Sequence, residues 1–99
     1  MSSFRKMIIE EARLVMLRLL SEQAEYQSNS SILDRALDEF GLNLSRDQVD
    51  SELAWLAEQG LVTTDRVLSI TRATLTLRGL DVAQGQASVP GVKRPSPKA

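Results

Sequence analysis

The chain has 99 residues, of which 42% are apolar and 25% are charged, and its formal net charge is −1. This length predicts one small domain, and the apolar fraction is sufficient for a single core. Cysteine and histidine are both absent, which excludes disulfides, thiolate or imidazole metal ligands and the commonest general base. No Gly-rich phosphate loop or nucleophile motif is present either. We therefore expect a protein that is not an enzyme and that binds no metal and no cofactor.

The charge is unevenly distributed along the chain. Residues 86–99 contain Lys93, Arg94 and Lys98 and no acid, so the rest of the chain carries a formal charge of −4. A body of this sign disfavours tight binding to nucleic acid, because affinity for nucleic acid comes largely from neutralised phosphates. The N-terminal stretch lacks the apolar run of a signal peptide, and no run approaches the roughly 18 residues of a membrane span. A cytoplasmic location without a membrane partner is expected.

Residues 3–22 are predicted to form a long first helix. Its main apolar face recurs every three or four residues and comprises Ile8, Ile9, Ala12, Val15, Met16, Leu19 and Leu20. Met7, Leu14 and Leu17 lie on the other side of the same helical wheel. Either neighbouring elements of the chain cover this second stripe, or it meets a partner subunit in a homodimer. A chain of this size has little other surface with which to cover both faces.

Two shorter helices joined by a tight turn are predicted next. Ser30 or Ser31 can cap the first of them, and Gly41 ends it. Its apolar stripe consists of Leu33, Ala36, Leu37 and Phe40. Residues 45–60 form the second, in which Ser45 and Gln48 have the spacing of a capping box. Two helices connected in this way are the helix-turn-helix pattern.

After Gly60 the apolar pattern changes from helical to extended. Residues 61–64 and 69–75 are predicted strands, and the turn between them, centred on residues 65–68, lacks the glycine of a two-residue hairpin turn. Thr76 can cap a last short helix, in which Gly79 permits close approach to the sheet. The predicted fold is mainly α with a small β-hairpin, a winged helix-turn-helix over residues 1–85, followed by a basic, Pro-containing tail over residues 86–99 without a core of its own.

Candidate DNA contacts come from three places in this fold. In a DNA-binding helix-turn-helix, the N-terminal face of the second helix of the motif meets base edges. That face offers Arg46, Gln48 and Ser51, and Gln48 has the chemistry to read adenine. The hairpin adds Arg66 and Arg72, and the tail adds Lys93 and Arg94. The same helix carries four acids against one cation, and those in its first turn can instead interact with the helix dipole.

Three apolar side chains allow either a structural or a binding role. Trp55 lies off the centre of its helix's core stripe, so it either packs on the hairpin strands or anchors a subunit interface. Val67 and Leu68, near the hairpin turn, either fold back on the body or wedge against a partner or a minor groove.

Several stretches together carry a family resemblance. They are Arg13 to Leu20 (RLVMLRLL), Leu44 to Val62 (LSRDQVDSELAWLAEQGLV), Ala73 to Ala83 (ATLTLRGLDVA) and Val89 to Pro97 (VPGVKRPSP). The chain resembles the small winged-helix proteins of Mu-like transposable phages and prophages, which are loosely similar to ArsR-type regulators. The resemblance implies a winged helix that binds double-stranded DNA and is often dimeric through its terminal helices.

Two functions follow as expectations. The first is a small DNA-binding winged-helix protein, a phage or prophage transcriptional regulator that forms a homodimer. The second is a winged-helix adaptor that binds protein during phage assembly or packaging, because fold does not settle function. A DNA binder should gather Arg46, Arg66, Arg72 and the tail cations on one side, and an adaptor should leave them scattered.

Overall fold

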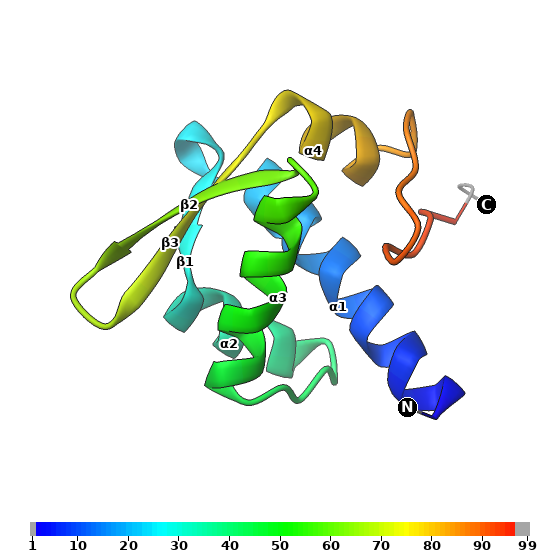
Figure 1. Cartoon of the computed structure of the whole chain (residues 1–99), viewed down its shortest axis with the longest axis horizontal. Helices are drawn as coiled ribbons and strands as arrows, with labels where there is room; N and C mark the ends of the chain where they lie inside the picture. The colour runs from blue at the N-terminus through cyan, green and yellow to red at the C-terminus, as the bar shows by residue number, and fades with distance from the viewer. Residues whose placement is uncertain (1, 97–99) are drawn as a thin grey trace.

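The computed structural model describes residues 2–96 and consists of four α-helices, a short 3-10 turn and a three-stranded sheet (Figure 1). In chain order these elements are α1 (Ser3–Ser21), η1 (Ala24–Tyr26), β1 (Gln27–Asn29), α2 (Ser30–Glu39), α3 (Arg46–Glu58), β2 (Val62–Val67), β3 (Ile70–Leu75) and α4 (Leu77–Ala83). The sheet is antiparallel with the order β1-β3-β2. This helix-rich arrangement is compatible with the predicted winged helix-turn-helix.

The predicted N-cap residues of α3 and α4 are the ones observed, and that of α2 is not. Ser45 and Gln48 form the predicted capping box of α3, and Thr76 caps α4 through the N–H of Gly79. The cap of α2 is Asn29, whose side chain accepts the N–H of Ile32, and not Ser30 or Ser31. Ser30 is buried instead, and its hydroxyl accepts the N–H of Thr71 on β3. This buried serine therefore ties the start of α2 to the sheet.

The core lies between α1, α2, α3 and the sheet, with α4 closing one end. Its largest fully buried side chains include Leu14, Met16, Leu17, Leu20, Leu33, Leu37, Leu53, Leu56 and Leu61. Gly79 allows α4 to lie directly on the backbone after α3, because a Cβ there would be 2.0 Å from the carbonyl oxygen of Leu61. The predicted close approach at Gly79 is thus confirmed. Phe40, predicted to continue the core stripe of α2, is 60% exposed because the helix ends before that side chain reaches the core.

The sheet differs from its prediction in two respects. Residues 27–29 form a third strand, β1, which pairs with β3 through Gln27, Ser28 and Asn29. The hairpin is also longer than predicted, because Val67 pairs with Ile70 and leaves only Leu68 and Ser69 in the turn. Leu68 takes the positive φ of +58° that a glycine would adopt more easily. A two-residue turn therefore forms without glycine.

The predicted boundary at residue 85 is wrong. Val89 and Val92 are buried and belong to the core cluster, and the N–H of Lys93 donates to the carbonyl of Glu10 on α1. We call residues 86–96 the C-terminal segment. It packs along α1, so it is part of the domain despite its proline-rich composition. Among residues 2–96, no helix is long and apolar enough to cross a membrane.

Candidate nucleic-acid interface

Helix α3 turns one face to the core and the opposite face to solvent. Val49, Leu53 and Leu56 are fully buried. Arg46 and Ser51, two of the predicted DNA contacts, are both exposed, Ser51 on the opposite face and Arg46 at the open N-terminal end of the buried stripe. The N-terminal end of α3 lies beside α2 at the lower edge of Figure 1. The first two turns of α3 are therefore sterically open to a ligand.

Gln48 is less available for base recognition than the sequence suggests. Its side-chain oxygen accepts the backbone N–H of Ser45 at 2.9 Å, while its own backbone N–H donates to the Ser45 hydroxyl. A bidentate contact to adenine needs both the oxygen and the amide N–H of glutamine. Reading adenine would therefore break one bond of the capping box that starts the helix.

Two of the four acids of α3 are held by cations of the same chain. Glu52 faces α1, where its Oε1 is 2.6 Å from the Nε of Arg13. Asp50 lies beside the hairpin, with its Oδ2 at 3.8 Å from Nη1 of Arg66. A count of charges along α3 therefore overstates the negative charge that a phosphate would meet at its exposed face.

Arg66 connects the hairpin to α3. In addition to its position near Asp50, its guanidinium donates to the hydroxyl of Thr71 at 3.0 Å and to the carbonyl of Ser69 at 3.3 Å. The bonds to Thr71 and Ser69 fix the guanidinium within the hairpin, and the approach to Asp50 is the contact that reaches α3. The guanidinium is still more than half exposed, which leaves it accessible to a phosphate.

Arg72 is mainly a structural cation. Its Nε and Nη2 donate to the two carboxylate oxygens of Asp65, its partner across β2 and β3. The hydrogen bonds from Arg72 lower the pKa of Asp65, and the same bonds raise the pKa of Arg72. Because the pair is almost neutral overall, Arg72 contributes less to phosphate binding than its charge alone suggests.

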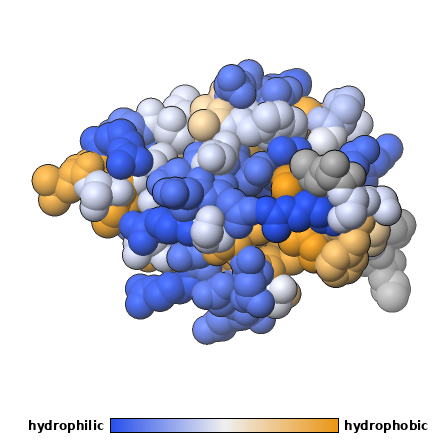
Figure 2. All heavy atoms as spheres, turned by 60° about the horizontal axis from the view of Figure 1, so that its bottom comes forward, coloured by the Kyte–Doolittle hydropathy of each residue, from blue (hydrophilic) through white to orange (hydrophobic). Residues whose placement is uncertain are grey.

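The hairpin ends in an apolar tip, which we define as Val67 and Leu68. Leu68 is 96% exposed and Val67 is 44% exposed, so neither folds back on the body. Figure 2 shows this tip as apolar surface at the left end of the molecule. An exposed tip of this kind fits the predicted wedge and not the alternative of packing on the body.

Lys93 and Arg94 belong to the C-terminal segment, which lies on the side of the molecule away from the hairpin (Figure 1). Lys93 pairs with Glu11 of α1, with 3.0 Å between Nζ and Oε1. Figure 1 shows the C-terminal segment on the right of the molecule and the hairpin on the left. The C-terminal segment and the hairpin therefore lie on different sides of the body in Figure 1, which counts against the prediction that the tail cations and Arg66 gather on one side. Lys98 lies outside the described residues.

The predicted dimer interface is also largely wrong. Leu14 and Leu17 are fully buried in the core of the single chain, because the sheet and α4 cover the side of α1 that carries them. Met7 alone of that stripe stays exposed. The second stripe is therefore mostly core, and Met7 is its one member left to meet a partner.

Trp55 is partly buried against α1 and the C-terminal segment. The guanidinium carbon of Arg13 lies 3.7 Å from the centroid of the Trp55 ring. Arg13 also donates to the carbonyl of Gly91 at 2.8 Å, and a Cβ on Gly91 would come within 2.8 Å of the indole. We call Arg13, Glu52, Trp55 and Gly91 the Arg13 cluster. It joins α1, α3 and the C-terminal segment, and no local pattern of the sequence predicted it.

Metal binding would need side chains among the described residues that could together coordinate an ion. No group of three or more His, Cys, Asp or Glu side chains lies close enough together to hold an ion there. The exposed groups near α3 and the hairpin are therefore a set for hydrogen bonding, ion pairing and apolar contact.

Comparison with known proteins now gives the family. Over 92 residues the chain is 49% identical to a protein of Escherichia phage Mu described as "Uncharacterized protein gp26", covering 93% of this chain and 95% of the phage protein. The chain belongs to the family of Mu gp26. A Haemophilus influenzae protein is 42% identical over 94 residues, covering 89% of this chain and 91% of its own length. No general family model matches the chain. The predicted relation to Mu-like phages is thus confirmed for this gp26-family chain.

Solved structures show likeness at the level of the fold. The complex structures of hsRosR-S4 and hsRosR-S1 superpose with TM-scores of 0.63 and 0.64, each at 19% sequence identity and over 87% of this chain. The aligned parts cover 67% and 69% of those chains. The gp26-family chain therefore shares the main architecture of RosR with little sequence in common.

Proposed function

We propose that this gp26-family protein is a winged helix-turn-helix that binds double-stranded DNA as a phage or prophage transcriptional regulator. Helix α3 enters the major groove and the hairpin lies over the adjacent backbone. The function is one of binding and not of catalysis. The similarity to the RosR complexes supports the fold on which this function depends.

One observation carries the DNA-binding function. Arg66 of the hairpin lies 3.8 Å from Asp50 in the second turn of α3, and Arg46, one turn before Asp50, and Ser51, the residue after it, are both exposed. Asp50 lies 3.8 Å from Arg66 and Glu52 pairs with Arg13 of α1, whereas Asp47, next to Arg46, is exposed and forms no ion pair within residues 2–96. A phosphate near Arg66 therefore meets weaker repulsion than the net charge of α3 predicts.

A fluorescence anisotropy titration with duplex DNA at low salt tests this function. Arg46→Ala and Arg66→Ala should each weaken binding, and Arg46→Ala should weaken a preferred sequence more than random duplex. Arg94→Ala is the matched control, because it removes an exposed cation on the other side of the molecule. With two or three phosphate contacts, the logarithm of affinity should fall with the logarithm of salt with a slope of about −2 to −3 per subunit. Absence of binding to any duplex, including sequences selected from a random pool, would overturn the function.

The apolar tip favours a second candidate, a protein-binding adaptor in phage assembly or packaging. Leu68 is almost fully exposed at a positive φ, and exposed apolar side chains in strained turns are typical of contact sites. The two functions differ in what Leu68→Ser does. It should leave the binding of random duplex nearly unchanged if DNA is the ligand of α3. It should abolish binding to phage proteins if the tip is the main contact.

A further inference from the structure

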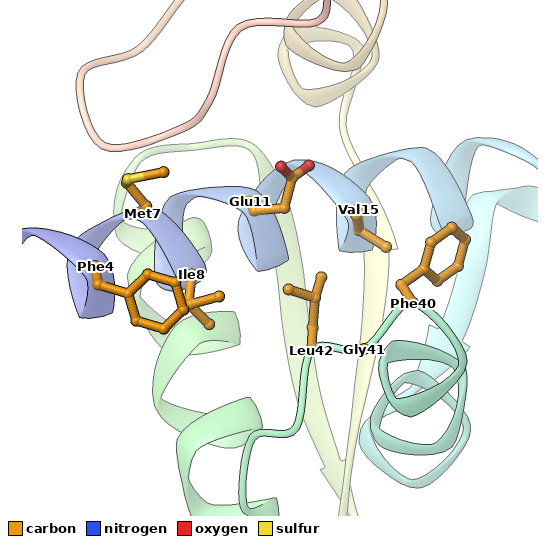
Figure 3. A pocket seen from close by; sticks show the side chains of 8 residues that line it. All are labelled: Phe4, Met7, Ile8, Glu11, Val15, Phe40, Gly41 and Leu42. Atoms are coloured by element: carbon orange, nitrogen blue, oxygen red, sulfur yellow. The ribbon is translucent and has the colours of Figure 1, made fainter.

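A shallow groove runs along the outer side of α1, where the turn after α2 meets it (Figure 3). Phe4, Ile8, Glu11 and Val15 line it from α1, and Phe40 and Leu42 line it from the end of α2 and the following turn. It has a volume of about 360 Å³. We call it the α1–α2 groove. Its apolar lining is open to solvent, since Phe4 is 70% exposed and Phe40 is 60% exposed.

The α1 side of the groove has the spacing of a helix-pairing seam. Phe4, Ile8, Glu11 and Val15 follow one another at intervals of four, three and four residues. This alternation keeps side chains on one line along a helix and lets a second helix pack against them. Figure 2 shows the corresponding apolar surface toward the right of the molecule, over the N-terminal half of α1. The groove therefore fits a helix better than a small ligand.

The charges around the groove indicate what charge a helix that packs there should carry. The first turn of α1 carries Arg5 and Lys6, and the last turn of α2 carries Asp38 and Glu39. Both pairs oppose the helix dipole, which favours acids at the N-terminus and cations at the C-terminus. All four side chains are exposed, and within residues 2–96 none of them forms an ion pair. Arg5 is therefore the electrostatic complement of the acidic pair. Lys6 points to the opposite side of α1, where it lines a hollow with Ile9, Glu10, Arg13 and Gly91.

We propose that a second copy of this chain docks in the α1–α2 groove. The two α1 helices lie antiparallel about a twofold axis, so that Phe4 of each copy packs near Phe40 of the other. Arg5 of each copy then faces the acidic end of α2 in the other copy. A twofold axis requires such a self-complementary surface, in which each contact occurs twice. This dimer does not depend on whether α3 binds DNA.

Analytical ultracentrifugation of the full chain over a wide concentration range tests the groove as a dimer contact. The wild type should sediment as a dimer at high micromolar concentration, and Phe4→Glu should weaken dimerisation by about tenfold or more by placing a charge in the apolar contact. Leu77→Glu is the matched control, because Leu77 is 79% exposed but lies on α4, outside the groove. A wild type that stays monomeric, or a Phe4→Glu variant that still dimerises like wild type, overturns the dimer. The first result would favour a different protein as the occupant.

Charge reversal gives a sharper test that does not alter the core. One variant is Arg5→Glu, and the other combines Asp38→Lys and Glu39→Lys. Each variant alone places like charges at both contacts and should dimerise about tenfold or more weakly than wild type. A mixture of the two should form a heterodimer, because both contacts are then again of opposite charge. Circular dichroism establishes that each variant is folded, and failure of the folded mixture to dimerise overturns this arrangement.

Discussion

The hairpin and the C-terminal segment, which both extend from the helical body, differ in how the fold holds them. The hairpin has the regular alternation and paired backbone of a sheet, yet of β2 only Val62 is buried. The C-terminal segment has no helix or strand, yet it buries Val89 and Val92 and accepts a hydrogen bond from Arg13. Regular backbone hydrogen bonding and attachment to the core are therefore separate properties. The segment belongs to the core, and the hairpin is a projection available for binding.

Deleting residues 86–99 should have the largest effect on stability. Two buried valines contribute about 1.5 kcal/mol or more each, so the free energy of unfolding should fall by about 3 kcal/mol or more. Urea denaturation of the truncated and intact chains measures it. A chain that ends at Arg94 is the control, since it keeps both valines and should unfold like the intact chain. Equal stability of the two truncations would contradict the attachment of the segment.

Arg13→Ala should be next in magnitude. Glu52 is then left mostly buried without its partner, and the contacts to Trp55 and Gly91 are lost together, so we expect a loss of about 2–4 kcal/mol. The hairpin offers the matched comparison, because Arg72→Ala breaks an ion pair that is largely in solvent. Thermal or urea unfolding should show no clear change for Arg72→Ala. If the two variants lost similar amounts of unfolding free energy, the C-terminal segment and the hairpin would not differ in how firmly they are held.

The local signals of the sequence predicted the helices well. The caps Ser45 and Thr76 and the role of Gly79 depend on residues within a few positions, so the sequence displays them directly. The Arg13 cluster was missed because its partners are 39 and 78 residues away from Arg13. Strand β1 was missed because its three polar residues have no apolar alternation and are ordered only by pairing with β3.

The candidate site was predicted only in part, because some of its features depend on contacts between residues that are far apart in the sequence. Ser51 is exposed as the helical wheel of α3 requires, whereas Arg46 shares the wheel position of Leu53 and is exposed because it begins the helix. The availability of the other cations depends on their partners, and the sequence does not show that Lys93 pairs with Glu11 or that Arg72 pairs with Asp65. A list of charged residues therefore predicts where a ligand can approach, but not which charges remain to meet it.

A smaller effect is expected at the apolar tip. Leu68→Gly should raise the free energy of unfolding by about 0.5–1 kcal/mol, because glycine adopts the positive φ at lower cost and Leu68 has little burial to lose. Urea unfolding measures this gain. Val67→Gly is the control, because Val67 is a strand residue without a positive φ and should be destabilised. A loss of stability in Leu68→Gly would show that the turn is not strained.

The smallest effect should be the dependence of hairpin stability on pH. Arg72 lowers the pKa of Asp65 in the folded chain below its ordinary value of 3.8. The resulting stabilisation is fully present above that value and is lost as the pH falls through the lowered pKa. Chemical shifts of hairpin amides, followed from neutral pH to below pH ~3, should report this titration. Asp65→Asn should remove it, and an unchanged titration in that variant would assign it to another carboxylate.

The Arg13 cluster also gives the chain an internal reporter of its own folding. Trp55 is the sole tryptophan, and Gly91, which lies against it, is far from it in the sequence. Contacts between residues far apart in sequence close slowly. The indole of Trp55 should therefore stay exposed to solvent while α1, α2 and α3 associate. Its fluorescence emission should shift only when Gly91 packs against it. Stopped-flow fluorescence, compared with far-ultraviolet circular dichroism, would then separate helix formation from closure of the domain.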